Sequence, residues 1–142
     1  MKEMTTQETR EFLRAGTRTG KLATVSADGS PHVAPIWFEL DDHGNLFFTT
    51  GASTVKGRNL RREPRLPLCV DDENPPFAHV VLHGVAEISE DRDELLKWAT
   101  RVGGRYMGAD QAEEFGRRNA VEGELLVRVT PSKIVALRNI AD

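Results

Sequence analysis

The sequence predicts a mainly β protein, a closed or half-closed antiparallel β-barrel with helices at its periphery. Three observations lead to this prediction. About seven short segments have the composition of β-strands, turn signals such as "ADGS" and "DDHGN" separate several of them, and the helical segments between them are few. A chain of 142 residues has the size of one domain, so we expect a single domain spanning residues 1–142.

The N-terminal part is expected to hold one helix and three strands. Thr5 or Thr6 can cap a helix that ends near Gly16. An Asp-Gly pair in "ADGS" marks a hairpin between the first two strands. Because tight turns join all three strands, we expect a β-meander, with strands at residues 21–26, 32–40 and 46–50.

The central part is expected to hold a helix between two further strands. The helix covers residues 53–63, and Pro64 ends it. The next strand, at residues 65–71, contains Pro67, which indicates a sheet edge or a bulge. The longest strand is expected at residues 77–89.

The C-terminal part is expected to hold two helical segments and two closing strands. The first helix covers residues 90–102, and we expect Gly103 and Gly104 to break it before a second helical segment at residues 108–120. A Pro-Ser turn is expected between the closing strands, at residues 124–130 and 133–138.

Alternate residues of the longest predicted strand differ in character, which indicates two different environments. One face is small and apolar, as inside a barrel: Ala78, Val80, Leu82, Gly84, Ala86 and Ile88. The other face mixes aromatic, aliphatic and polar residues, as an oligomer interface or ligand wall would: Phe77, His79, Val81, His83, Val85 and Glu87. In the second strand, the same alternation directs Trp37 away from the core, toward a flat ligand, a partner subunit or a packing site within the monomer.

The chain is acidic overall but has one strongly basic segment. Its formal net charge is -3, which argues against general nucleic-acid binding. The helix at residues 53–63 has Ser53 or Thr54 as its N-cap, and its first turn carries Lys56 and no acid, so a bound anion would complement it. The alternatives are a solvated basic surface and pairing of these cations with acids elsewhere on the chain. The basic residues are Lys56, Arg58, Arg61, Arg62 and Arg65.

Several classes of chemistry find no support in the sequence. The single cysteine, Cys69, excludes an internal disulfide, and no segment resembles a signal peptide or a membrane span, so we expect a cytoplasmic protein. His79 and His83 would lie about 13 Å apart along one strand, too far to share a metal. No nucleophile motif or acid/base pair is present, so we assign no catalytic residue and expect a cofactor to supply any chemistry.

Three segments together resemble one family. They are "LATVSADGSPHVAPIWF", "FFTTGASTVKGRNLRREPR" and "VDDENPPFAHVVLHGVAEI". The sequence is similar to the pyridoxamine-phosphate-oxidase-like split-barrel proteins, and within them to actinobacterial deazaflavin-dependent oxidoreductases. This resemblance implies an FMN-binding type of split β-barrel that forms a homodimer with cofactor sites at the interface. As the residues themselves indicate, we expect no metal.

The resemblance also implies which residues hold the cofactor. Backbone groups of two strands would contact its ring, Lys56 would bind its phosphate, and the start of the longest strand would approach it from the partner subunit. Some members have an arginine at the position of Thr54, so here the other cations must supply more charge. The implied cofactor-binding residues are Pro35, Ile36, Trp37, Thr49, Thr50, Thr54, Lys56, Arg58, Asn59, Phe77 and Ala78.

The cofactor and reaction are also implied by the resemblance. Coenzyme F420 has an acidic tail that the arginines after Lys56 would suit, and FMN is the alternative. The expected reaction transfers a hydride between the deazaflavin and an electron-poor conjugated small molecule of the quinone, tetrapyrrole or enone type. Two alternatives are an FMN-dependent oxidoreductase of the same fold and a non-enzymatic carrier of the cofactor or a tetrapyrrole. His79, His83 and Tyr106 are interpreted as structural residues rather than proton donors.

Overall fold

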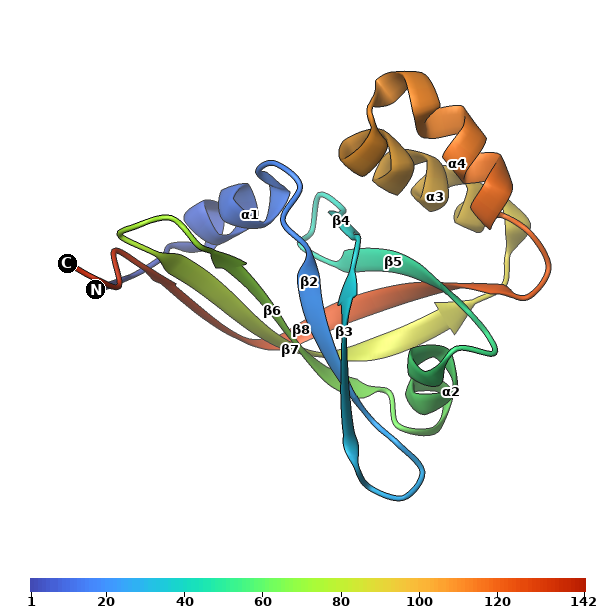
Figure 1. The fold of residues 1–142 in the computed structure, drawn as a ribbon, viewed down its shortest axis with the longest axis horizontal. Helices are drawn as coiled ribbons and strands as arrows, with labels where there is room; N and C mark the ends of the chain where they lie inside the picture. The colour runs from blue at the N-terminus through green and yellow to red at the C-terminus, as the bar shows by residue number, and fades with distance from the viewer.

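The computed structural model describes all residues, 1–142, as a curved antiparallel sheet with four α-helices around it (Figure 1). The strands pair in the order β3-β2-β6-β7-β8-β5-β4, and β1 pairs with β8. Because β3 and β4 are consecutive in the chain yet stand at opposite ends of this order, the sheet curls into a half-barrel. The strands are β1 (Lys2–Glu3), β2 (Gly20–Val25), β3 (Pro31–Ile36), β4 (Glu39–Leu40), β5 (Leu46–Gly51), β6 (Arg65–Asp72), β7 (Ala78–Ser89) and β8 (Glu124–Arg138).

The helices lie at two ends of the sheet. In Figure 1, α3 and α4 lie side by side near β5, whereas α1 lies toward the end that carries both chain termini. A short 3₁₀-helix, Ala109–Gln111, joins α3 to α4. No helix is both long enough and apolar enough to cross a membrane. The helices are α1 (Thr6–Arg14), α2 (Val55–Arg62), α3 (Arg92–Met107) and α4 (Ala112–Asn119).

Local signals in the sequence account for the first elements. Thr5 caps α1, and its side chain and that of Glu8 form a reciprocal capping box. Gly29 adopts a φ of 87° in the turn between β2 and β3, a conformation that glycine adopts without strain. The predictions of a helix after Thr5 and a hairpin at "ADGS" are therefore confirmed.

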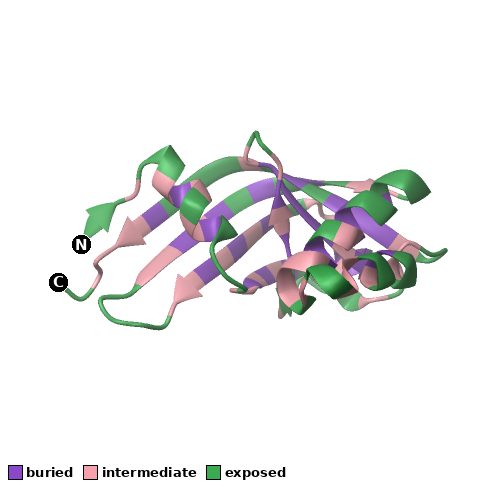
Figure 2. Ribbon diagram, turned by 90° about the horizontal axis from the view of Figure 1, so that it is seen from above, coloured by how far each residue is buried: buried purple, intermediate pink, exposed green.

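The core lies on the concave face of the sheet. Figure 2 shows buried and more exposed residues alternating along the strands, as expected when one face is covered. Leu68 and Leu82 are paired across β6 and β7, and both are buried. Burying a side chain of this size stabilises the fold by about 1.5–3 kcal/mol. The two-faced pattern predicted for β7 is confirmed, since Val80 and Leu82 are buried while His83 and Val85 are exposed.

A smaller cluster attaches α3 to the sheet. Phe47 of β5 stacks on Trp98 of α3, with ring centroids 3.8 Å apart and an interplanar angle of 3°. Leu95 and Leu126 complete this cluster of four buried residues. The stacked pair attaches α3 to the start of β5.

The predicted meander is wrong, because β3 and β5 do not pair. The chain leaves the ladder after Ile36 and resumes pairing as β4 at Glu39. At the break, the amide of Phe38 donates to the Tyr106 hydroxyl (3.3 Å), and its carbonyl accepts from Arg105 (2.8 Å). Two side chains of α3 therefore replace the strand partners that the backbone lacks here.

Gly103 and Gly104 do not break α3, which continues to Met107. A Cβ atom added to Gly103 would lie 2.5 Å from the Cβ of Phe115 in α4. Glycine is needed here because the two helices approach closely, and their packing outweighs the low helix propensity of glycine.

The predicted turn between two closing strands is also wrong, because β8 is one strand of 15 residues. Gly84 pairs with Pro131 and His83 with Lys133, which leaves Ser132 as an extra residue in a bulge. The Ser132 hydroxyl donates to the His83 carbonyl at 3.2 Å. The strand thus continues through Pro131 with a bulge, and the chain does not reverse direction.

In the sheet, β6 lies between β2 and β7, but at Pro67 it pairs only with His83 of β7. The two β6 residues that pair with β2 are Leu68 and Cys69, so Pro67 stands outside this part of the ladder. A proline is tolerated in this strand because no β2 residue pairs with it, so the absence of its N–H costs no hydrogen bond to β2.

Candidate functional site

A cavity of about 300 Å³ opens where the ends of β3 and β5 meet the start of α2. Helices α3 and α4 and the first residue of β8 complete its wall. Seven of the residues that the sequence predicts for the cofactor site line this one cavity: Pro35, Ile36, Trp37, Thr49, Thr50, Thr54 and Lys56. Segments far apart in the chain therefore meet at this cavity, and their role in cofactor binding stays a prediction.

The start of α2 forms the polar end of this cavity. Thr54 is the N-cap, and its hydroxyl accepts from the Gly57 amide (3.1 Å) and donates to the Gly51 carbonyl (2.7 Å). The hydroxyl of Thr50 lies 2.9 Å from the hydroxyl oxygen of Thr54. Both threonine hydroxyls are thus bonded within the chain, while the first amides of the helix have no intrahelical partner.

Lys56 is the cation of the cavity wall. It lies in the first turn of α2, which contains no acid, and its ammonium makes no hydrogen bond or ion pair within the chain. A free ammonium beside unpaired helix amides is an arrangement that attracts an anion.

Trp37, the residue after β3, provides an aromatic part of the cavity wall and packs against α3. Trp37, which is 40% exposed, stacks on Tyr106 with centroids 5.1 Å apart and lies 6.0 Å from the Phe115 ring. The Tyr106 hydroxyl donates to the Arg18 carbonyl at 2.8 Å, and burial raises the pKa of this phenol. These bonds support the interpretation of Tyr106 as a structural residue.

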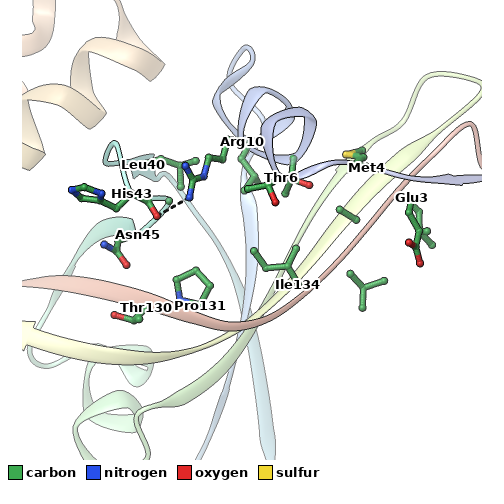
Figure 3. A pocket seen from close by; sticks show the side chains of 16 residues that line it. Glu3, Met4, Thr6, Arg10, Leu40, His43, Asn45, Thr130, Pro131 and Ile134 are labelled. Carbon is green, nitrogen blue, oxygen red and sulfur yellow. Dashed lines mark hydrogen bonds between the residues drawn. The ribbon is translucent and has the colours of Figure 1, made fainter.

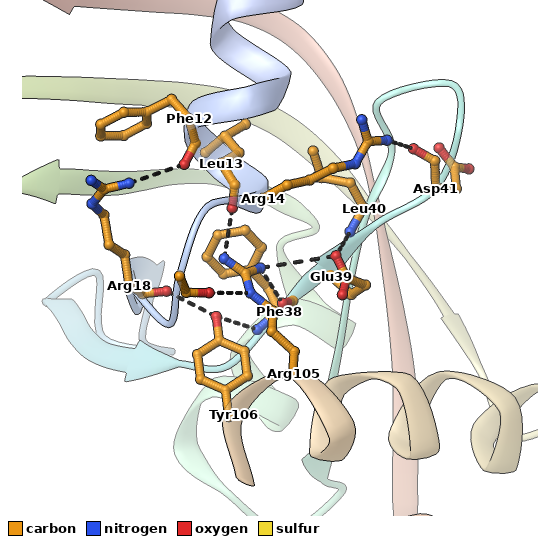
Figure 4. A network of polar contacts seen from close by, with 11 residues as sticks. Phe12, Leu13, Arg14, Arg18, Phe38, Glu39, Leu40, Asp41, Arg105 and Tyr106 are labelled. Atoms are coloured by element: carbon orange, nitrogen blue, oxygen red, sulfur yellow. Dashed lines mark hydrogen bonds and ion pairs between the residues drawn. The ribbon is translucent and has the colours of Figure 1, made fainter. Parts of the chain in front are cut away.

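Arg105 anchors the same wall. Figure 4 shows its guanidinium donating to three backbone carbonyls, those of Leu13 (2.7 Å), Gly16 (3.0 Å) and Phe38 (2.8 Å). Its side chain is only 7% exposed, and Glu39 lies 4.0 Å away as a counter-ion. One arginine thereby joins α3, the end of α1 and the break between β3 and β4.

The predicted residue Asn59 lies behind the cavity rather than in its wall. It is 4% exposed, and its amide donates to the Thr24 hydroxyl at 3.0 Å. Arg62 in turn donates to the Asn59 oxygen at 3.1 Å. This network joins α2 to β2, and it occupies the polar groups that a ligand would need.

The predicted arginines differ in their surroundings. Arg58 is exposed and makes no ion pair, although it does not line the cavity. Arg61 pairs with Glu90 at 3.4 Å. Arg65 pairs with Glu63 and belongs to β6, so it lies outside the helix that carries the other arginines.

Phe77 and Ala78 do not line the cavity. They stand at the start of β7, where the carbonyl of Phe77 accepts from the Ile140 amide near the C-terminus (3.2 Å). Phe77 and Ala78 therefore lie at the end of the sheet near both termini, away from the predicted residues that line the cavity of the same chain (Figure 1).

Sequence reasoning missed the part of the wall that α3, α4 and β8 provide. Because Gly103 was interpreted as a helix breaker, the face of α3 that borders the cavity was not predicted. Ala99 and Gly103, two small residues four positions apart, were the signal in the sequence for this face. Glu124 could not be found from local sequence, because only its pairing with Gly51 brings it to the site. The missed residues are Ala99, Val102, Gly103, Phe115, Asn119 and Glu124.

Glu124 is the second titratable group of the cavity. Burial raises the pKa of its carboxyl, and the charge of Lys56 partly offsets this rise. Its carboxylate forms no hydrogen bond or ion pair within the chain. The cavity therefore holds one cation and one acid, each without a direct partner.

A larger cavity of about 490 Å³ lies elsewhere, between α1 and the second half of β8 (Figure 3). Arg10 spans its rim and donates to the His43 carbonyl at 3.0 Å. None of the predicted cofactor residues lines it, and no group of three or more potential metal ligands occurs in the structure. The smaller cavity is thus the candidate site on chemical grounds rather than by size.

Comparison with known proteins identifies the family of this chain. The family described as pyridoxamine 5'-phosphate oxidase matches residues 5–136. A 5a,11a-dehydrotetracycline/5a,11a-dehydrooxytetracycline reductase of Streptomyces rimosus is 31% identical over 137 residues, which cover 92% of this chain and 80% of the relative.

Two solved structures resemble the fold over most of their length. The conserved hypothetical protein Rv2991 from Mycobacterium tuberculosis is 28% identical, with a TM-score of 0.84 over 98% of this chain and 89% of that chain. An F420 reductase is 27% identical, with a TM-score of 0.67 over 87% of this chain and 94% of its own. The fold predicted from the sequence is confirmed, and the chain belongs to the pyridoxamine 5'-phosphate oxidase family of oxidoreductases.

Proposed function

We propose that this protein is an F420-dependent reductase that binds the cofactor in the cavity between β3, β5 and α2. The observation that carries the proposal is the convergence of Lys56, the start of α2 and the aromatic wall at Trp37 in one cavity. When bound, reduced F420 supplies a hydride for an electron-poor acceptor. The residues of the chain bind, orient and shield it.

The chemistry of the cavity fits a flat cofactor with an anionic end. Lys56 and the free amides of α2 provide positive potential at the polar end. Pro35, Ile36 and Trp37 provide a mostly apolar wall for a ring. The hydroxyls of Thr50 and Thr54 contribute less, because both are bonded within the chain.

Two observations favour F420 over FMN. An F420 reductase is among the structural relatives at 27% identity. Arg58, two residues after Lys56, makes no ion pair, so its guanidinium is free to meet the acidic tail. By contrast, Arg61 and Arg65 have acidic partners. FMN remains the alternative cofactor because it shares a flat ring and a phosphate.

The proposed acceptor is a conjugated, electron-poor small molecule. The relative in Streptomyces rimosus is a 5a,11a-dehydrotetracycline/5a,11a-dehydrooxytetracycline reductase, which supports a small organic acceptor. The apolar residues Val102 and Phe115 on the helical side of the cavity suit the body of such an acceptor. We assign no proton donor to the reaction, because both bonds of the Tyr106 hydroxyl are made to backbone groups.

We also propose a homodimer that uses the convex face of the sheet. This face exposes several aliphatic side chains in one chain, including Val33 (67%), Val85 (43%) and Val135 (39%). A second copy would cover them in a symmetric interface. Phe77 and Ala78 would then approach the cavity of the partner, since they cannot reach the cavity of their own chain.

The test is an assay of F420 turnover with a panel of quinones, tetrapyrroles and enones. The proposal predicts oxidation of reduced F420 with at least one acceptor. Tight binding without oxidation by any acceptor would instead support a non-enzymatic carrier. Protein that retains FMN through purification and does not bind F420 would support the FMN-dependent alternative.

A further inference from the structure

The cavity contains an acid that the proposed cofactor does not require. Glu124 opens β8 and lines the cavity together with Thr54 and Lys56. It pairs with Gly51 across β5 and β8, and one of its carboxylate oxygens lies 3.8 Å from the position that a Cβ of Gly51 would occupy. The strand register thus directs the carboxylate toward the same end of the cavity as the start of α2.

No other titratable group shares this space. Residues of β3, β5, α3 and α4 that line the cavity are apolar or uncharged, and α2 contributes only Lys56. Lys56 and Glu124 are close enough to interact electrostatically but form no ion pair. An anion that binds Lys56 would therefore face one carboxylate with no second cation to neutralise it.

We propose that Glu124 takes up a proton when the anionic end of a ligand binds beside Lys56, so that binding is coupled to proton uptake and strengthens toward acid pH. This inference rests on the proposed function only for the identity of the ligand, because any anion bound beside Lys56 would have the same effect on Glu124. The physical cause is that the ligand anion cancels the stabilising field of Lys56 on the carboxylate and adds a like charge. The residue thereby also disfavours ligands with more negative charge at that position.

The sign of the pH effect follows from the two states. Burial already raises the pKa of Glu124 in the free protein, and a bound anion raises it further. Below both values the carboxyl is neutral in each state, and ligand affinity is highest. Above both values it is charged in each state, and affinity is lowest. Affinity therefore falls as pH rises through this interval.

The experiment follows the Glu124 carboxyl carbon by NMR during pH titrations of the free protein and of protein with F420, FMN or sulfate. Sulfate provides an anion that does not itself titrate near neutral pH. The proposal predicts a higher titration midpoint with any ligand that binds, and E124Q should show no proton uptake by calorimetry in buffers of different ionisation enthalpy. E124Q should also bind the same ligand several-fold more tightly than the wild type at pH 8.

The control is E122Q, which makes the same change in charge at an exposed residue that does not line the cavity. It should retain the proton uptake of the wild type. An unchanged midpoint with bound ligand, or weaker binding by E124Q, would overturn the inference while leaving F420 binding intact. If F420 and FMN both fail to bind, the proposed function fails, and the sulfate titration alone decides the role of Glu124.

Discussion

At the scale of single residues, two predicted cofactor ligands have different surroundings. Lys56 lines the cavity with no partner, whereas Asn59 is buried and bonded to Thr24. The same helix thus presents one free cation to the cavity and one amide to the sheet. Affinity and stability measurements separate these two roles.

Substituting Lys56 with alanine should weaken binding of the cofactor. The expected loss is about 1.5–3 kcal/mol, the typical scale of a hydrogen bond to a charged group. R61A is the matched control, because Arg61 lies on the same helix but pairs with Glu90. Binding titrations with F420 measure both variants, and equal affinities for K56A and the wild type would exclude Lys56 from the site.

Substituting Asn59 with alanine should lower the free energy of unfolding rather than act mainly on affinity. The loss leaves the buried hydroxyl of Thr24 without its donor, which typically costs about 1–3 kcal/mol. Urea denaturation measures the effect. A variant of unchanged stability that binds cofactor poorly would restore Asn59 to the binding site.

At the scale of elements, the contact between α3 and α4 shapes the helical side of the cavity. Gly103 and Phe115 belong to both the contact and the cavity wall. A change in their packing should therefore alter stability and cavity shape together.

Replacing Gly103 with alanine should destabilise the protein by about 1–3 kcal/mol, as overpacking of a tight contact does. The added methyl would meet Phe115 at 2.5 Å. G104A is the matched control, since its methyl would meet Ala112 at 3.2 Å and alanine is the better helix former. Thermal unfolding should show a lower midpoint for G103A than for G104A. Equal midpoints would contradict the close contact.

The helices and strands could be predicted where local signals decide the structure. The capping box at Thr5 and Glu8 and the Asp-Gly turn are such signals. They correctly predicted the start of α1 and the hairpin between β2 and β3. Gly103 and Pro131 are local breakers that tertiary contacts override, through helix packing in one case and a bulge in the other. Those contacts join residues far apart in the sequence, so no local pattern reveals them.

At the scale of the whole molecule, the sheet order decides which residues meet. The residues that the motif resemblance names in β3, β5 and α2 lie together along one side of the cavity. The α3, α4 and β8 side depended on topology, because Glu124 reaches the site only through its pairing with Gly51. The convex face of the sheet exposes aliphatic side chains, which a second copy of the chain would cover in the proposed dimer.

Replacing Val85 with glutamate should convert the proposed dimer into monomers. Symmetry places the new charge in the interface twice, where burying an unpaired charge is costly. L96E is the control, because Leu96 on α3 has nearly the same exposure, 42% against 43% for Val85. Light scattering after size-exclusion chromatography gives the mass. A V85E variant that stays dimeric would place the interface elsewhere.

The central claim is that the cavity at the start of α2 binds a deazaflavin cofactor. Parallel binding titrations of the wild-type protein with F420 and FMN, followed by fluorescence, test it most directly. We expect saturable binding of F420 that is tighter than binding of FMN. Stoichiometric binding of FMN with no fluorescence change on adding F420 would contradict the claim.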